Sequence, residues 1–457
     1  MSILSRPFRR REVLTALPAS VLLAGSVYAD MPNVKYYTPE QFGADPTGKT
    51  ASSIAFISML EAAMADGFLC ICDRPGAIYR FDRSVNIRTR GRPVSLRGLG
   101  FAKTKILIDG WFTGISIAGA AQHEEMVELK DFEITRLNYQ TYTGKIGNRS
   151  IAVTRAKRVV ISGIKESGSI GFGIFVDRCF DYEISRCVVS DHLNGKAHLS
   201  GTDGIHIYRS PGPGKVFENT IHDVGDDAIS FGSFYSNEPT QNFQCYNNRI
   251  SNTAGSIKIY GNAQTFRIFD NVVTSPKTGG VIIYDDRNVA QSFKISGGEI
   301  QGNIVKGQIG AGISGGISIW SPTGDGEGIQ SNIVIRNNQI EDGNFGITVA
   351  SQAPNKFSEG VVVADNQIQR MRQRGIMIDR CSGPFSVTGN VVSETGFESA
   401  FLGEVRSGGK SADLEFSSNK LSRYAIVDRA RYAIKCDPRW SIGSNAVDGP
   451  ADRWRAP

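Results

Sequence analysis

The sequence lacks several features that would assign it to a familiar class. None of its apolar stretches reaches the ~18 residues of a membrane-spanning helix. Its 51 glycines follow no three-residue period, so a collagen-like chain is excluded. No block of like charges occurs, which argues against nucleic acid as a partner. With 40% hydrophobic residues and an excess of glycine, the 457-residue chain has the composition of many short strands joined by turns.

Cysteine is scarce, and its number is odd. The seven residues are Cys70, Cys72, Cys179, Cys187, Cys245, Cys381 and Cys436. In an oxidising compartment at least one of them lacks an intramolecular partner. Cys70 and Cys72 fall on the same face of an expected strand, where side chains are poorly placed to bridge. We expect most of the seven to be small apolar side chains, with one disulfide as the alternative.

The N-terminus has the composition of a targeting signal. The basic segment Phe8-Arg9-Arg10-Arg11-Glu12 precedes an apolar run, Leu14–Tyr28, that is too short to span a bilayer and is followed by Ala29. This pattern predicts a signal peptide over residues 1–29, and the alternative is a basic amphipathic start to the fold. The paired arginines resemble the twin-arginine export motif, which implies the twin-arginine export machinery as a partner and a periplasmic or secreted mature protein.

Removal of this segment lowers the formal charge from +6 to about +3. A mildly basic groove would still attract an acidic polysaccharide.

From about residue 150 the chain repeats a short apolar run that opens with a small residue. The copies begin at Gly173, Gly204, Ala228, Ser256, Gly280, Gly316, Gly346 and Gly375. Strand alternation directs Ile205 and Ile207 to the inside and His206, Ser230 and Lys258 to the outside. Self-similarity at this period is typical of a solenoid.

A second pattern keeps phase with the first: an apolar residue, two variable positions, Asn, one variable position and another apolar residue. Its asparagines are Asn219, Asn248, Asn271, Asn338, Asn366, Asn390 and Asn419, with Cys187 and Gly298 expected at the same place in two more copies. Successive copies lie 23 to 40 residues apart, which suits a coil of three short strands and three turns. The amides can stack into a ladder, whereas a two-sheet sandwich would not keep this phase.

The start of the mature chain carries a family resemblance. The segments Phe42–Thr50 and Arg74–Tyr79, separated by an expected helix over Ser52–Ala65, resemble the cap of the pectate-lyase-like superfamily. With the repeats, this resemblance implies an all-β, single-stranded right-handed parallel β-helix (solenoid) with an N-terminal capping helix. Together with the arginine motif, the chain resembles the exported β-helix repeat proteins of that superfamily.

The expected organisation is one elongated domain behind a signal peptide, rather than the three domains that the length suggests. It comprises a signal peptide at 1–29, an N-terminal cap and first coils at 30–110, β-helix repeats at 111–425, and a C-terminal cap or tail at 426–457.

Variation in the repeat phase predicts where a groove lies. Most length variation follows the Gly-Ile strands, so these loops should form one wall along that sheet. Two coils also lengthen the opposite edge, and the insertions Ser190–Thr202 and Gln301–Gly315 are expected to form the other wall.

The strongest site candidate is a set of carboxylates on two successive coils. Alignment of Gly201–Ile207 with Gly225–Phe231 places Asp203 beside Asp227, one rung apart, with Asp226 adjacent. Three carboxylates this close cannot all ionise freely, which produces an acid beside a base, as glycoside hydrolysis requires. The alternative is that all three are turn residues that precede strands.

This arrangement resembles the catalytic strands of polygalacturonases. The resemblance implies that one aspartate protonates the leaving oxygen while the other two position water. The next two coils depart from that family, because Ala254–Lys258 and Gly279–Tyr284 carry neither its Gly-His-Gly nor its Arg-Ile-Lys motif. Galacturonan is therefore not implied as the substrate.

A polysaccharide lyase is the second enzymatic interpretation. Elimination needs a base such as Lys258, His206 or Tyr260 and a cation near the developing charge. His192, His198, His206 and His222 fall within 31 residues, and five aspartates lie among or directly beside them (Asp191, Asp203, Asp223, Asp226 and Asp227), a clustering that permits a metal without firm ligand spacing. No cofactor is firmly implied, although calcium is possible at the carboxylates.

A non-catalytic β-helix that binds polysaccharide or forms an envelope scaffold is the third interpretation. Aromatic residues near the ends of successive Gly-Ile strands are candidates for sugar stacking in either case: Tyr208, Tyr260, Tyr284 and Trp320. Arg287 adds a candidate cation for the same face. The expected ligand is thus a polysaccharide or oligosaccharide.

Overall fold

The computed structural model describes residues 35–120, 125–141, 147–192, 201–235, 237–284, 293–310, 314–321, 328–351, 356–403, 414–424, 433–448 and 454–455. The expected signal peptide lies outside the described residues. Tyr36–Pro457 belongs to one compact unit. No helix of the described residues is long and apolar enough to cross a membrane.

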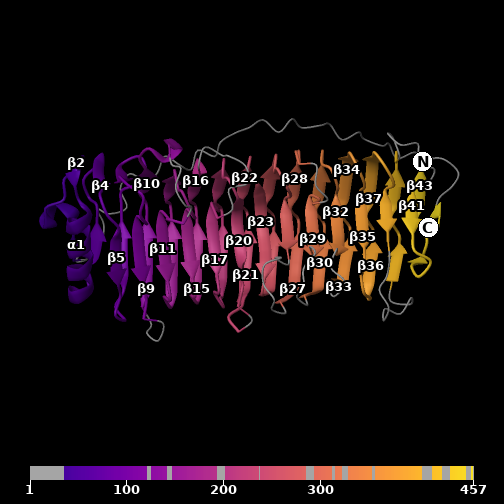
Figure 1. The fold of residues 1–457 in the computed structure, drawn as a ribbon, viewed down its shortest axis with the longest axis horizontal. Helices are drawn as coiled ribbons and strands as arrows, with labels where there is room; N and C mark the ends of the chain where they lie inside the picture. Colours follow the sequence, from indigo (N-terminus) through magenta and orange to yellow (C-terminus); the bar gives the residue numbers. More distant parts are fainter. Residues whose placement is uncertain are drawn as a thin grey trace, which may run out of the picture. The chain divides into compact units, whose positions relative to one another are not determined.

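Three parallel sheets make up this unit, and each coil contributes one strand to each sheet (Figure 1). Strand β1 pairs with β3 and β2 with β4; from β3 onward each strand pairs with the strand three places later in the chain, as in the ladders β11–β14, β14–β17 and β17–β20. Because each coil returns one rung further along, side chains at equivalent positions stack in rows.

Sheet 1 contains, in spatial order, β1 (Tyr36–Tyr37), β3 (Leu69–Ile71), β6 (Val94–Arg97), β9 (Met126–Lys130), β12 (Arg158–Ser162), β15 (Asp181–Ser185), β18 (Gly214–Phe217), β21 (Thr240–Tyr246), β24 (Ala263–Phe269), β27 (Phe293–Gln301), β30 (Gly328–Arg336), β33 (Lys356–Ala364), β36 (Phe385–Thr388), β39 (Leu414–Ser417) and β42 (Ser441–Ile442).

Sheet 2 contains β2 (Thr47–Ala51), β4 (Ala77–Phe81), β7 (Thr104–Ile108), β10 (Glu133–Arg136), β13 (Lys165–Ser167), β16 (Val188–Ser190), β19 (Thr220–His222), β22 (Arg249–Ser251), β25 (Val272–Thr274), β28 (Ile304–Lys306), β31 (Gln339–Glu341), β34 (Gln367–Met371), β37 (Val391–Thr395), β40 (Lys420–Ser422) and β43 (Ala446–Asp448).

Sheet 3 contains β5 (Val85–Arg88), β8 (Ile115–Ala118), β11 (Ile151–Thr154), β14 (Ile174–Asp177), β17 (Ile205–Tyr208), β20 (Asp227–Ser233), β23 (Gly255–Gly261), β26 (Val281–Tyr284), β29 (Ile317–Ser321), β32 (Ile347–Ser351), β35 (Ile376–Asp379), β38 (Ala400–Leu402), β41 (Ile434–Cys436) and β44 (Trp454–Arg455). The strands β41 to β44 extend the three sheets beyond residue 425.

A helix closes the N-terminal end of the core, as the sequence predicts. Helix α1 (Ser53–Asp66) begins one residue later than expected and is capped at its C-terminal end by Gly67, whose φ of 72° is left-handed. The ring centre of Phe56 in α1 lies 5.0 Å from the ring centres of Tyr79 and Phe81. The short helices η2 (Pro39–Phe42) and η3 (Tyr139–Thr141) complete the helical elements of the described residues.

The interior is a continuous aliphatic and aromatic core. Ile205, Ile207, Ile229 and Phe231 are fully buried, which confirms the predicted alternation of sheet 3. All seven cysteines are buried and unpaired, so they act as apolar side chains and the alternative disulfide is not formed.

The asparagine ladder runs from Asn219 to Asn445 at the turn between sheets 1 and 2. Each amide Nδ2 donates to the Oδ1 of the asparagine on the next rung, and the backbone N–H of each residue donates to the same oxygen. The chain of bonds continues through Asn338, Asn366, Asn390 and Asn419. Cys187 lies at the first rung, where its N–H donates to Asn219, as predicted.

The expectation for Gly298 is wrong. Asn303, not Gly298, occupies that rung, because β27 is nine residues long and the pattern belongs to Ile300 and Asn303. Gly298 instead pairs with Phe266, whose ring fills the space that a Cβ would need. The predicted wall Gln301–Gly315 therefore begins too early, since it includes strand β28. Of the other predicted wall, residues 193–200 lie outside the described residues.

Candidate functional site

The candidate site lies on the outer face of sheet 3, where three neighbouring strands run in register. Ile205 of β17 pairs with Ile229 of β20, which pairs with Ile257 of β23. Residues in register at this site form three rows. We call them the first row (Asp203, Asp227, Gly255), the second row (His206, Ser230, Lys258) and the third row (Tyr208, Gly232, Tyr260).

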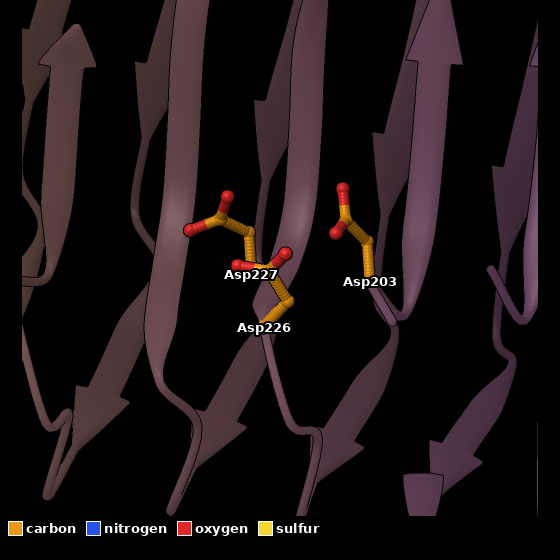
Figure 2. Close-up of side chains that lie close together, drawn as sticks. All are labelled: Asp203, Asp226 and Asp227. Atoms are coloured by element: carbon orange, nitrogen blue, oxygen red, sulfur yellow. The ribbon is translucent and has the colours of Figure 1, made fainter. Parts of the chain in front are cut away.

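The three predicted aspartates meet at the first row. Asp203 leads into β17, while Asp226 and Asp227 lie at the start of β20 one rung away (Figure 2). Carboxylate oxygens from all three lie within 4.8 Å of one another. Asp203 and Asp227 are buried and Asp226 is partly buried, so water screens their mutual repulsion only weakly.

The surroundings separate the proton affinities of these carboxyl groups. Burial, reinforced by the charges of Asp227 and Asp203, raises the pKa of Asp226 to about 8. Burial also raises the pKa of Asp227 to about 6, although the Lys258 ammonium opposes the shift. Burial acts upward on Asp203 too, but His206, Ser230 and Lys258 outweigh it and lower the pKa of that carboxyl. Near neutral pH the cluster therefore holds a proton on Asp226 beside an ionised Asp203.

His206 is enclosed within a hydrogen-bonded group. Its Nδ1 lies 2.6 Å from Asp203 Oδ2, and its Nε2 lies 2.8 Å from the Tyr260 hydroxyl. The Ser230 hydroxyl donates to the same Asp203 oxygen at 2.5 Å. Phe172 stacks on the imidazole with the ring centroids 4.1 Å apart. Both ring nitrogens thus take part in hydrogen bonds, one with the Asp203 carboxyl and one with the Tyr260 hydroxyl.

Tyr260 is not the exposed sugar platform that the sequence predicts. Its side chain is buried, with only 4% of the residue exposed. The ring lies against Gly232, where an added Cβ would come within 2.5 Å of Tyr260 Cδ1. Gly232 therefore makes room for Tyr260 to reach across the rung of β20 to His206 on β17.

Lys258 lies beside the aspartates, as predicted. Its Nζ is 3.4 Å from Asp227 Oδ2 and 5.2 Å from the centre of the Tyr284 ring. The Asp227 carboxylate in turn occupies the space beside Gly255, because a Cβ added to this glycine would lie 1.8 Å from Asp227 Oδ1. The ion pair and the glycine together determine the position of the Asp227 carboxyl.

The predicted aromatic row exists in register. Tyr260 pairs with Tyr284 of β26, which pairs with Trp320 of β29. Tyr208, Tyr284 and Trp320 are each partly exposed on the face that carries the aspartates. Arg287, the candidate cation, lies outside the described residues, as does His198.

Two features of the site were missed by the sequence analysis. Tyr235, 46% exposed, follows β20 and lies next to Tyr208. The Arg209 guanidinium lies 4.7 Å from the Tyr208 ring centre and 5.0 Å from that of Tyr235, and it is held by two bonds to Asp177. The exposed ring of Tyr235 belongs to a loop outside both repeat patterns, so only its aromatic character could have indicated it.

The second missed feature is a buried pair behind the cluster. His192 Nε2 lies 2.7 Å from Glu166 Oε2, and both side chains are completely buried. His192 Nδ1 contacts the carbonyl oxygen of Thr202 at 3.0 Å, and the neighbouring Gly201 N–H donates to Asp226. Burial opposes the imidazolium, yet Glu166 holds the pKa of His192 above its usual value. The His192–Glu166 pair thus holds the backbone of Thr202, the residue directly before Asp203.

The histidines do not form a metal cluster among the described residues. His222 lies on sheet 2 and pairs with Asp223, whereas His206 lies on sheet 3 and His192 pairs with Glu166. Within the described ranges, the group close enough to share an ion is Asp203, Asp226 and Asp227.

Calcium fits this group poorly. Ca²⁺ takes six to eight oxygen ligands, whereas Asp203 Oδ2 is already engaged by Ser230 and His206 and Asp227 is paired with Lys258. The three aspartate side chains are therefore considered as acid and base groups rather than as calcium ligands.

Comparisons with known proteins agree with the geometry at the level of the fold. A family model for a right handed β-helix region matches residues 113–295. The fold is a right-handed parallel β-helix. This confirms the fold class that the sequence predicts. No curated protein sequence matches the chain.

Several solved structures are similar. The catalytic unit of a thermostable GH87 α-1,3-glucanase from Streptomyces thermodiastaticus strain HF3-3 has 16% identity and a TM-score of 0.60, with 93% of this chain and 70% of that chain covered. The Agl-KA catalytic domain has 12% identity and a TM-score of 0.51, with 93% and 69% covered. A GH87 α-1,3-glucanase catalytic domain in complex with nigerose has 15% identity and a TM-score of 0.51, with 82% and 66% covered.

Proposed function

We propose that this β-helix cleaves glycosidic bonds of a polysaccharide by hydrolysis at Asp203, Asp226 and Asp227. The observation that carries the proposal is the convergence of three carboxyl groups within 4.8 Å. Their surroundings raise the pKa of Asp226 to about 8, through burial and neighbouring charge, and lower that of Asp203. Glycosidases pair a protonated and an ionised carboxyl group in this way.

In the proposed reaction Asp226 is the general acid. Its carboxyl proton passes to the glycosidic oxygen as the bond to the anomeric carbon breaks. Asp203 and Asp227 hold a water molecule, accept its proton and direct its oxygen to the anomeric carbon. Lys258, His206 and Ser230 keep these two carboxylates in place through the contacts at 3.4, 2.6 and 2.5 Å.

The substrate in this proposal lies along sheet 3. Tyr208, Tyr235, Tyr284 and Trp320 offer partly exposed rings on which sugars stack. Oligosaccharides bind some of the similar structures: GH87 α-1,3-glucanase catalytic domains are in complex with nigerose and with tetrasaccharides.

A lyase mechanism receives less support from the geometry. It requires Lys258 or His206 to accept a proton from carbon. The Lys258 ammonium is paired with Asp227, and both His206 nitrogens are hydrogen-bonded within the site. We therefore favour hydrolysis over elimination, and a non-catalytic scaffold remains an outcome of the experiment below.

The test is a product assay over neutral and acidic polysaccharides with the mature chain. New reducing ends without ultraviolet absorbance of an unsaturated sugar support hydrolysis, whereas unsaturated products would indicate a lyase. The Asp226→Asn variant should lose the activity. The Asp223→Asn variant is the matched control, because Asp223 is more exposed and lies next to His222 of sheet 2. Equal activity of wild type and Asp226→Asn, or no cleavage of any polysaccharide, would refute the proposal.

Export by the twin-arginine route is part of the same proposal, and it rests on the motif at Arg9 to Arg11 and the apolar run that follows. Replacement of the three arginines by lysine should retain the precursor in the cytoplasm, as measured by cell fractionation. Unchanged export would contradict this route.

A further inference from the structure

Arg149 lies on the face that carries the aspartates, two rungs before Asp203. Ile151 pairs with Ile174, which pairs with Ile205, so Arg149 occupies the register position of Phe172, Asp203 and Asp227. Two rungs correspond to roughly 10 Å along the sheet. Arg149 therefore extends the first row beyond the proposed cleavage site toward the N-terminal coils.

The guanidinium of Arg149 is partly buried on an aromatic surface. Its Cζ lies 4.1 Å from the ring centre of Phe175 and 5.5 Å from that of Phe172. Phe172 in turn stacks on His206, which bonds to Asp203. A continuous stack thus connects Arg149 to the carboxylate cluster.

This guanidinium has no anionic partner among the described residues. Its buried Nε makes no hydrogen bond, and no carboxylate of the described chain forms an ion pair with it. Asp177, whose charge favours the Arg149 cation, is already bonded twice by Arg209. Burial accordingly lowers the pKa of Arg149. A partly desolvated cation without a counter-ion is costly, and the aromatic rings compensate only in part.

We infer that Arg149 is a binding subsite for a negatively charged substituent of a sugar, a carboxylate or a sulfate ester. Two planar N–H groups of a guanidinium match the oxygens of such a group, and the adjacent Phe rings suit the apolar face of a sugar. Trp111, 44% exposed on the loop one coil earlier, offers a further ring, and its carbonyl oxygen accepts a hydrogen bond from the Asn148 amide. The preferred substrate is accordingly an acidic polysaccharide.

This inference depends on the proposed function only for the direction of the bound chain along sheet 3. The other cations of the site support it indirectly. Arg209 is paired with Asp177, and Lys258 with Asp227, so both already have an anionic partner. Of these three described cations, Arg149 is therefore the one that a ligand would neutralise.

The test is calorimetric binding in the Asp226→Asn background, which prevents turnover. The ligands are matched pairs: de-esterified and fully methyl-esterified homogalacturonan, carboxymethyl dextran and dextran, and dextran sulfate and dextran. We expect an acidic polymer to bind at least about tenfold more tightly than its neutral counterpart, and Arg149→Gln to remove most of that difference. Arg149→Lys should retain part of it.

The matched control is Arg267→Gln. Arg267 also lies over a phenylalanine, Phe269 at 5.0 Å, but it belongs to β24 of sheet 1. The Arg267→Gln substitution changes the net charge by the same amount as Arg149→Gln and should leave the binding of acidic polymers unchanged. Preference for carboxylated polymers assigns a sugar acid, and preference for dextran sulfate assigns a sulfate ester.

The inference is overturned if no acidic polymer binds more tightly than its neutral counterpart, or if Arg149→Gln binds the acidic polymers like the parent. Its failure is distinguishable from failure of the proposed hydrolysis. Binding that depends on Arg149 without cleavage by the wild type retains the subsite and refutes the hydrolase. Cleavage of neutral polymers that is unaffected by Arg149→Gln retains the hydrolase and refutes the acidic subsite.

Discussion

The asparagine ladder and the aspartate row use the same stacking geometry for opposite purposes. On the ladder, every amide both donates to and accepts from its neighbours, so buried polar groups satisfy one another rung after rung. On the first row of sheet 3, Asp203 and Asp227 are instead carboxyl groups that can only accept when ionised, and the Asp226 carboxyl lies beside them. Asp226 therefore reaches a pKa of about 8, because burial and two like charges disfavour its ionised form.

A solenoid brings equivalent residues of successive coils together whatever their chemistry. One rung of about 4.8 Å brings equivalent residues together wherever the repeat is kept. A neutral donor and acceptor at such a position stabilises the fold, whereas an acid at such a position perturbs its neighbours.

Asp226→Asn should have the largest effect and should act in opposite directions on activity and stability. Loss of the general acid lowers hydrolysis by about 10²- to 10⁴-fold. Because the folded pKa of about 8 exceeds an unfolded value near 3.9, the wild type loses stability as pH rises from about 4 to about 8. The variant lacks this loss, so its gain in melting temperature should grow across that range. A variant equally active, or less stable at pH 8, would contradict the contrast.

His192→Leu should be next, because it leaves the completely buried Glu166 without its partner. Removal of one member of a buried pair destabilises by about 3–5 kcal/mol. Denaturant unfolding measures the loss. The double variant His192→Leu/Glu166→Leu should recover much of it, since neither charge remains. A single variant as stable as the wild type would show that the pair does not hold Thr202 and Asp203.

Asn271→Asp places a carboxyl group on the asparagine ladder and so tests whether an acid at a stacked position destabilises the fold. The Asn271 amide donates to Cys245, Phe269 and Asn303, and a carboxylate would face all three oxygens without a proton. We expect a loss of about 1–3 kcal/mol or more, which increases as pH rises above about 4. The control is Asn337→Asp, an exposed asparagine directly before the ladder residue Asn338. Equal, pH-independent effects in both variants would contradict the explanation.

Gly255→Ala should have the smallest effect, confined to activity. The new Cβ would displace the Asp227 carboxyl and its contact with Lys258. We expect kcat to fall by about 10- to 100-fold with little change in melting temperature. Addition of Gly255→Ala to an Asp227→Asn variant should cause no further loss if the glycine acts through Asp227. Additive losses would place its role elsewhere.

Much of the fold was predictable because the repeat is written in local patterns. The Gly-Ile runs and the asparagine positions determine the phase of the coils, and phase alone places Asp203 beside Asp227. The exception, Gly298 in place of Asn303, arose because β27 is extended and the pattern could be matched five residues too early.

The parts that could not be predicted depend on side chains that cross between coils. Tyr260 is buried because its ring passes over Gly232 to His206, 54 residues away, and no repeat pattern indicates this. The His192–Glu166 pair likewise joins positions of no shared pattern. Arg149 precedes the first clear copy of the repeat, so its register with Asp203 emerges only from the paired strands.

The most direct test of the central claim is the titration of the Asp226 carboxyl carbon by ¹³C NMR, with Asp226→Asn used for assignment. It requires no substrate. We predict that this carboxyl group titrates at about 8 and that Asp203 stays ionised well below that pH. An Asp226 that titrates near 4, like an isolated aspartate, would contradict the assignment of a general acid at this site.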